Sequence, residues 1–168
     1  MSKKELLLGN EKFLNSFKNT QLLNELVNGQ HPKAIVITCS DSRVIPEEIF
    51  SQTFGDLFVI RTAGNVINDG ELASIEYGIY HLHCSLVMVM GHTHCGAVHA
   101  AVPNEKGLYL DPVLNRISKN ISGINNEKEA SKTNALKEVE FIKQKFPDYF
   151  GEIVASLYNL ESNKVEIL

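Results

Sequence analysis

Two short groups of residues in this chain combine side chains that bind metal ions or move protons. The first, Cys39-Ser40-Asp41-Ser42-Arg43, contains a thiol, a carboxylate and a guanidinium, and the second is Gly91-His92-Thr93-His94-Cys95-Gly96. Thiolate sulfur and imidazole nitrogen are the donors that zinc prefers. The His-x-x-Cys spacing lets His92 and Cys95 reach one ion from a single loop. The residue types therefore indicate a metal site made of Cys39, His92 and Cys95.

The elements that would position these residues are two short strands. Apolar runs at residues 34–38 and 85–90 precede the two groups directly and are typical of buried strands in a parallel sheet. In open sheets of this kind, chemistry collects beyond the carboxyl ends of the strands. A cysteine taken alone is more often a small buried apolar residue. The placement of three ligands at two strand ends favours the metal site.

Asp41 and Arg43 stand two residues apart, so in an extended loop their side chains point the same way. A charge-assisted pair would hold the carboxylate of Asp41 as an oriented hydrogen-bond acceptor. Structural ion pairs of this kind are common elsewhere. The position beside Cys39 favours a role in the site.

Taken together, these motifs resemble the β-class carbonic anhydrases. That family carries Cys-x-Asp-x-Arg after its first strand and His-x-x-Cys after a later one, which here are Cys39, Asp41 and Arg43, then His92 and Cys95. The resemblance covers most of the chain and is weak only between about 102 and 148. It extends to residues 30–33, 55–65, 75–77 and 157–161.

The resemblance implies a zinc lyase that interconverts CO2 with bicarbonate and a proton through a zinc-bound hydroxide. One Zn²⁺ per chain would be bound by Cys39, His92 and Cys95. In the family, the aspartate at the position of Asp41 either hydrogen-bonds the hydroxide or binds the metal itself, and the arginine at the position of Arg43 decides which. Some members of the family have a closed form that depends partly on a tryptophan near the N-terminus. The chain has no Trp, so the resemblance favours the open form, in which the aspartate does not bind the metal.

The same resemblance implies a substrate pocket. Gln30 matches a glutamine that hydrogen-bonds substrate, Phe58 and Tyr77 match apolar pocket positions, and Ala63 lies where some members have valine. A second interpretation stays open for Phe58 and Tyr77, because aromatic residues often simply fill cores.

Two interpretations also stay open for His94 and His99. Histidine titrates near neutral pH, so each could pass a proton to the buffer. Each could equally be a solvated side chain, and for His94 we favour this second interpretation.

The composition is that of an ordinary globular protein. Of the 168 residues, 43% are hydrophobic and 21% are charged, which fits one domain over residues 1–168. The net charge of -4 without a basic patch argues against nucleic acid as a partner. No apolar run approaches the roughly 20 residues that span a bilayer. Three cysteines and a short apolar start indicate a reducing compartment without a signal peptide, so we expect a cytoplasmic protein.

The order of the elements predicts an α/β fold. The resemblance implies a mostly parallel sheet flanked by helices, with an added edge strand at the C-terminus. A helical arm at about residues 3–28 would pack on a neighbouring subunit in a homodimer or dimer-based homo-oligomer. From its apolar spacing alone, the arm could equally cover its own core.

Two rival functions use the same residues. A relative with the same site could hydrolyse carbon disulfide or carbonyl sulfide instead. A non-catalytic zinc or redox-sensing module is the other rival. Asp41 and Arg43 argue against the second, because a purely structural zinc site needs neither.

Overall fold

The computed structural model describes residues 1–168, which divide into two compact units, 1–30 and 31–168. The first unit holds helix α1 (Lys3–Ser16) and helix α2 (Thr20–Leu26), and neither contains a buried residue. A capping box of Ser2 and Glu5 begins α1, and the side chain of Asn19 caps α2. These caps explain why the predicted helical arm consists of two helices.

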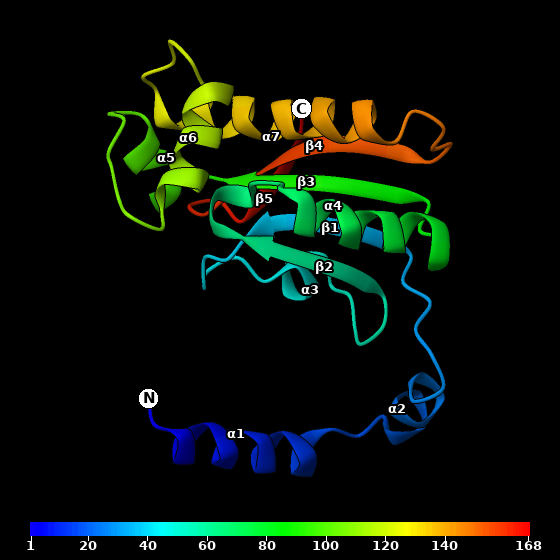
Figure 1. The fold of residues 1–168 in the computed structure, drawn as a ribbon. Coiled ribbons are helices and arrows are strands. Elements are labelled where there is room, and N and C mark those ends of the chain that lie inside the picture. The colour runs from blue at the N-terminus through cyan, green and yellow to red at the C-terminus, as the bar shows by residue number, and fades with distance from the viewer. The chain divides into compact units, whose positions relative to one another are not determined.

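The second unit is built on one five-stranded sheet with the order β2-β1-β3-β4-β5 (Figure 1). Strands β1 to β4 are parallel, and β5 pairs antiparallel with β4 at the edge. The α/β fold with an added C-terminal edge strand is therefore confirmed. The strands are β1 (Ala34–Cys39), β2 (Leu57–Thr62), β3 (Leu86–His92), β4 (Glu152–Asn159) and β5 (Lys164–Ile167).

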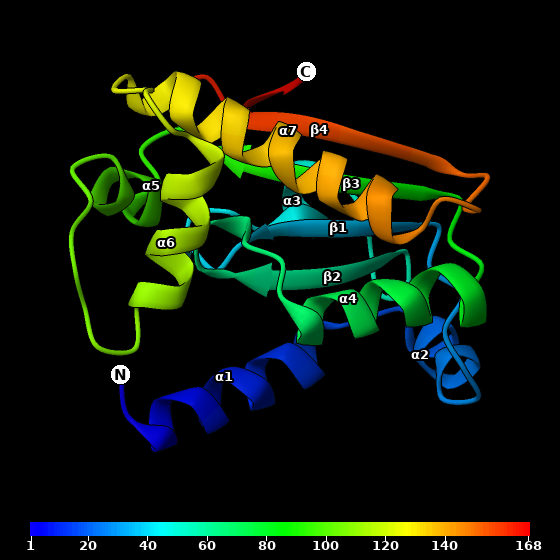
Figure 2. The same cartoon turned by 45° about the horizontal axis from the view of Figure 1, so that its top comes forward.

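Both faces of the central strand β1 are covered, and all six of its residues are buried. Ile35 and Ile37 belong to the larger core, which α4 (Asp69–Glu76), the π-helical turn η2 (Tyr77–His81) and α7 (Glu127–Lys145) complete. Figure 2 shows α4 and α7 lying across this face of the sheet. The opposite face contributes a smaller core, which includes Val36, Met90 and Tyr158 together with residues of and beside α3 (Pro46–Ile49).

A third core lies beyond the carboxyl ends of β1 and β3. Helices α5 (Gly96–Ala101) and α6 (Asp111–Asn120) contribute Val98, Leu114 and Ile117 to it, and Cys39 and Cys95 are members of the same cluster. The metal-binding residues predicted from the sequence therefore lie between the sheet and a pair of helices, where water is largely excluded.

The structure differs from the sequence-based expectations in two helices. The apolar spacing of residues 71–83 predicts one helix, but α4 ends at Glu76 and continues as the π-helical turn. The sequence also predicts a helix over residues 127–145 with Leu136 facing inward, but in α7 Leu136 is 39% exposed, whereas Asn134 and Glu138 are fully buried. The reason is a polar network between α6 and α7, described below. None of the helices combines the length and apolar character that crossing a membrane requires.

Candidate metal centre

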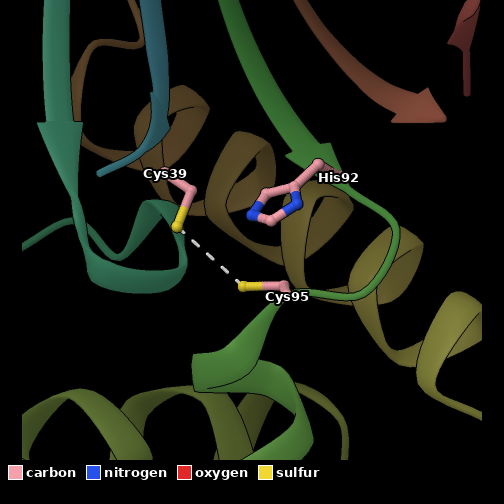
Figure 3. A group of neighbouring side chains, drawn as sticks. All are labelled: Cys39, His92 and Cys95. Atoms are coloured by element: carbon pink, nitrogen blue, oxygen red, sulfur yellow. Dashed lines mark hydrogen bonds between the residues drawn. The ribbon is translucent and has the colours of Figure 1, made fainter. Parts of the chain in front are cut away.

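Three potential metal ligands converge at the carboxyl end of the sheet. Cys39 ends β1, His92 ends β3, and Cys95 stands immediately before α5 (Figure 3). All three side chains are buried, and their ligand atoms lie within 4.8 Å of one another. The two sulfur atoms are 4.0 Å apart. The loop after β3 is short, so His92 and Cys95 reach the same point from one segment.

The donor set fits a zinc ion. Two thiolates bound tetrahedrally at about 2.3 Å from zinc would have their sulfurs roughly 3.8 Å apart, close to the observed separation. The Nδ1–H of His92 donates to the carbonyl oxygen of Thr93 at 2.9 Å, which leaves the lone pair on Nε2. That Nε2 is buried and has no hydrogen-bond partner within the protein. A buried acceptor without a partner is costly, and a metal ion would satisfy it.

The two thiols have different electrostatic environments. The Cys95 thiol, the His92 ring and the backbone N–H of Gly64 together lower the pKa of Cys39 to about 4. The Gly64 N–H donates to Cys39 Sγ at 3.3 Å. The neighbouring Cys39 sulfur and burial raise the pKa of Cys95. Cys39 therefore becomes a thiolate first, and a cation is needed for both to be thiolates together.

Asp41 is held by Arg43 through a two-pronged ion pair. Arg43 Nε donates to Asp41 Oδ1 at 2.9 Å, and Nη2 donates to Oδ2 at 2.7 Å. These hydrogen bonds from Arg43 lower the pKa of Asp41 well below its usual range. Asp41 Oδ2 also lies 3.9 Å from His92 Nε2, which places the carboxylate beside the cluster. The Arg43 guanidinium further donates to the carbonyl oxygen of His94 at 3.1 Å.

Arg61 fixes the loop that carries Cys39 and Asp41. Its Nε donates to the carbonyl oxygen of Cys39 at 3.2 Å, and its Nη2 donates to the carbonyl oxygen of Asp41 at 2.7 Å. Sequence reasoning missed this role and that of the Gly64 N–H. Parallel pairing of Thr38 with Arg61 brings Arg61 beside the loop, and a sequence does not give this register.

Within residues 31–168, only one of the predicted substrate residues lies near the cluster. Ala63 precedes Gly64 and so lies near Cys39. Phe58 pairs with Ile35, four positions before Cys39 on β1, which is about 13 Å along the strand. The Tyr77 ring is 6.2 Å from the Phe58 ring and is 46% exposed. Gln30 is exposed and belongs to the N-terminal unit.

His94, in the loop after β3, and His99, in α5, are both exposed and paired with carboxylates. His94 Nε2 lies 2.8 Å from Glu161 Oε1, and His99 Nδ1 lies 2.6 Å from Glu127 Oε1. The Glu127 carboxylate raises the pKa of His99. These pairs fit solvated side chains.

Comparisons with known proteins point to one family. Residues 34–165 match the family model described as carbonic anhydrase. Carbonic anhydrase 2 of Mycobacterium tuberculosis is 40% identical over 128 residues, which are 70% of this chain and 62% of that protein. This chain thus spans less than two thirds of that relative.

Solved structures agree with this match. The β-carbonic anhydrase CafA of Aspergillus fumigatus superposes with a TM-score of 0.86 at 27% identity, over 98% of this chain and 89% of that one. The β-carbonic anhydrase CcaA superposes with a TM-score of 0.81 at 30% identity, over 98% and 93% of the two chains.

Proposed function

Because this chain belongs to the carbonic anhydrase family, we propose that it is a zinc-dependent carbonate dehydratase that interconverts CO2 with bicarbonate and a proton. The observation that carries the proposal is the buried cluster of Cys39, His92 and Cys95 with the Asp41 carboxylate beside it. A structural zinc site would use four protein ligands, whereas three ligands and an adjacent acceptor suit a catalytic one.

We assign the metal-binding role to Cys39, His92 and Cys95. A zinc ion bound there would lower the pKa of a water molecule and so supply a nucleophile near neutral pH. Asp41 has a lowered pKa and is ionised, so it can only accept hydrogen bonds. Its role is to orient the nucleophile toward CO2. Arg43 binds both carboxylate oxygens of Asp41 and so keeps the carboxylate in this orientation.

In a single chain, the aromatic residues predicted to form the apolar wall for CO2, Phe58 and Tyr77, lie away from the metal ligands. We propose that Phe58, Tyr77 and Gln30 serve the site of a second copy of the chain, and that Ala63 serves its own. The exposure of Tyr77 and the distance of Phe58 from Cys39 along the sheet support this assignment. It agrees with a homodimer or a dimer-based oligomer. The three free cysteines further support a cytoplasmic location.

The experiment that tests the function is stopped-flow CO2 hydration on protein with verified zinc content, from about pH 6.5 to about 9. Two thiolates and one imidazole leave the site formally neutral, so activity should rise with pH above about 7, where an all-histidine site titrates. Absence of turnover at every pH, with zinc fully bound, would overturn the proposal. Turnover of carbonyl sulfide or carbon disulfide in its place would identify the first rival.

A further inference from the structure

A buried polar network joins α6 to α7 behind the metal centre. Glu138 of α7 is fully buried, and Arg116 of α6 donates to both of its carboxylate oxygens at 2.8 Å. Asn120, one helical turn further along α6, donates from Nδ2 to Glu138 Oε1 at 2.9 Å. Arg116 holds the Glu138 carboxylate in place, and the carboxylate in turn fixes the side-chain amide of Asn120.

The network continues to Asn134, which is also fully buried. Asn120 Nδ2 donates to Asn134 Oδ1 at 2.9 Å, and Asn134 Nδ2 donates to the carbonyl oxygen of Gly64 at 2.9 Å. The contact with Asn120 decides which way the Asn134 amide faces, because Oδ1 must accept from Asn120. The NH2 group of Asn134 is therefore directed at Gly64.

Gly64 is the residue through which the network reaches the metal centre. Its carbonyl accepts from Asn134, and its N–H donates to Cys39 Sγ at 3.3 Å. Gly64 adopts φ 64° and ψ 23°, a left-handed conformation that glycine adopts without strain. A Cβ at this position would lie 2.6 Å from Ile117 Cδ1 of α6. The packing of α6 and the hydrogen bond from α7 therefore define one orientation of the Gly64 peptide groups.

We propose that Asn134 is a positioning residue for the metal centre, which holds the Gly64 N–H on the sulfur of Cys39. The inference rests on the zinc site of the proposed function and adds Asn134, with Asn120 as its orienting partner, to the residues that serve it. Hydrogen bonds to a ligating sulfur fix its position and draw charge from it. Removal of a residue that hydrogen-bonds a metal ligand commonly lowers metal affinity by about 10-fold to 100-fold.

The test compares three variants with the wild type. Asn134→Asp keeps the size of the side chain and replaces the NH2 group with an oxygen that repels the Gly64 carbonyl. Asn120→Ala leaves Asn134 in place but removes the group that orients its amide. Ser131→Ala is the matched control, because Ser131 is also buried on α7 and its hydroxyl makes no hydrogen bond within the protein. Circular dichroism of each zinc-free variant reports whether the fold persists.

Two measurements distinguish positioning from a general loss of structure. In competition with a chelator, zinc affinity should fall by about 10-fold to 100-fold in Asn134→Asp, by less in Asn120→Ala and not at all in Ser131→Ala. In cobalt(II)-substituted protein, the thiolate-to-metal charge-transfer band should move to lower energy in the two asparagine variants, because the sulfur loses a hydrogen bond.

Unchanged affinity and an unchanged cobalt band in folded Asn134→Asp would overturn the inference. If that variant does not fold, the band of Asn120→Ala decides in the same way. An equal shift in Ser131→Ala would also overturn it. A wild-type protein that binds zinc but does not hydrate CO2 would defeat only the proposed function, since neither measurement depends on turnover.

Discussion

Asp41 is the single residue that most directly tests the proposed chemistry. Its carboxylate stays ionised across neutral pH because Arg43 lowers its pKa. Asp41→Asn should retain one zinc per chain by metal analysis, since Asp41 is not among the three clustered ligands. CO2 hydration should fall by about 10²-fold, because the nucleophile loses the hydrogen-bond acceptor that orients it.

The matched control for this change is Asp56→Asn. Asp56 also pairs with a cation, Lys33 at 2.8 Å, and its pKa is also lowered by that partner. Hydration should be unaffected in this variant, because Lys33 and Asp56 lie before β1 and β2 and so at the opposite end of these parallel strands from Cys39. Equal activity of Asp41→Asn and wild type would remove Asp41 from the mechanism.

His99 provides a prediction about pH. The Glu127 carboxylate stabilises the imidazolium form, so the pKa of His99 lies above its ordinary value of 6.5. The stabilisation from this pair is complete below about pH 6.5 and is lost as the pH rises through the raised pKa. In an NMR titration, Glu127→Gln should bring the midpoint of His99 down toward 6.5 while leaving the curves of the other histidines unchanged. A midpoint that does not move would show that the pair does not form in solution.

At the scale of elements, one buried ion pair joins α6 to α7 beside the hydrogen bonds of Asn120. Glu138 is fully buried and Arg116 is its only cationic partner among the ion pairs of the structure. Glu138→Ala leaves Arg116 without its carboxylate, which typically costs about 3–5 kcal/mol for a buried pair. The measurement is the free energy of unfolding in urea, with the zinc content held constant.

A control for Glu138 stands two residues further along the same helix. Glu140 pairs with Lys137 at 2.7 Å, but both side chains are about half exposed. Glu140→Ala should therefore cost less than about 1 kcal/mol. If the two substitutions destabilise the protein equally, burial of the Glu138 pair does not have the effect that we assign to it.

The same helix shows how far the sequence could predict the fold. The sequence predicts a helix over residues 127–145, and these are the bounds of α7, because the break at residues 122–126 marks its start locally. The burial of Asn134 and Glu138 was not predicted. Their partners are Gly64, Arg116 and Asn120, which lie on other elements, and residue type alone places such side chains on the surface.

The metal centre also has one part that the sequence predicts and another that it does not. Strand-end placement predicted that Cys39, His92 and Cys95 would meet, and in the structure their ligand atoms do. The rule needs only the apolar runs that precede them. The supporting contacts of Arg61 and Gly64 are hydrogen bonds to and from backbone atoms. These depend on strand register and on peptide orientation, for which no side-chain pattern exists in the sequence.

At the scale of the whole molecule, the N-terminal unit is the part whose own packing is least complete. Neither α1 nor α2 contains a buried residue, and four leucines of α1 are between 45% and 63% exposed. Leu7 and Leu14 are seven residues apart and so lie on one face of the helix. Exposed leucines in such a stripe usually mark an interface, which supports the proposal that the arm binds a second copy of the chain.

The proposal predicts the effect of charge on this stripe. Burying two leucines contributes about 3–6 kcal/mol to association, so Leu7→Glu with Leu14→Glu should weaken the oligomer by at least about 100-fold. Sedimentation equilibrium should then give a smaller mass, with zinc content retained because the three ligands lie in the other unit. Lys12→Glu makes the same total change in charge about 140° around the helix from Leu7 and should leave the mass unaltered. If the double variant keeps the wild-type mass, the arm does not form the interface, and its apolar face must instead pack within its own chain.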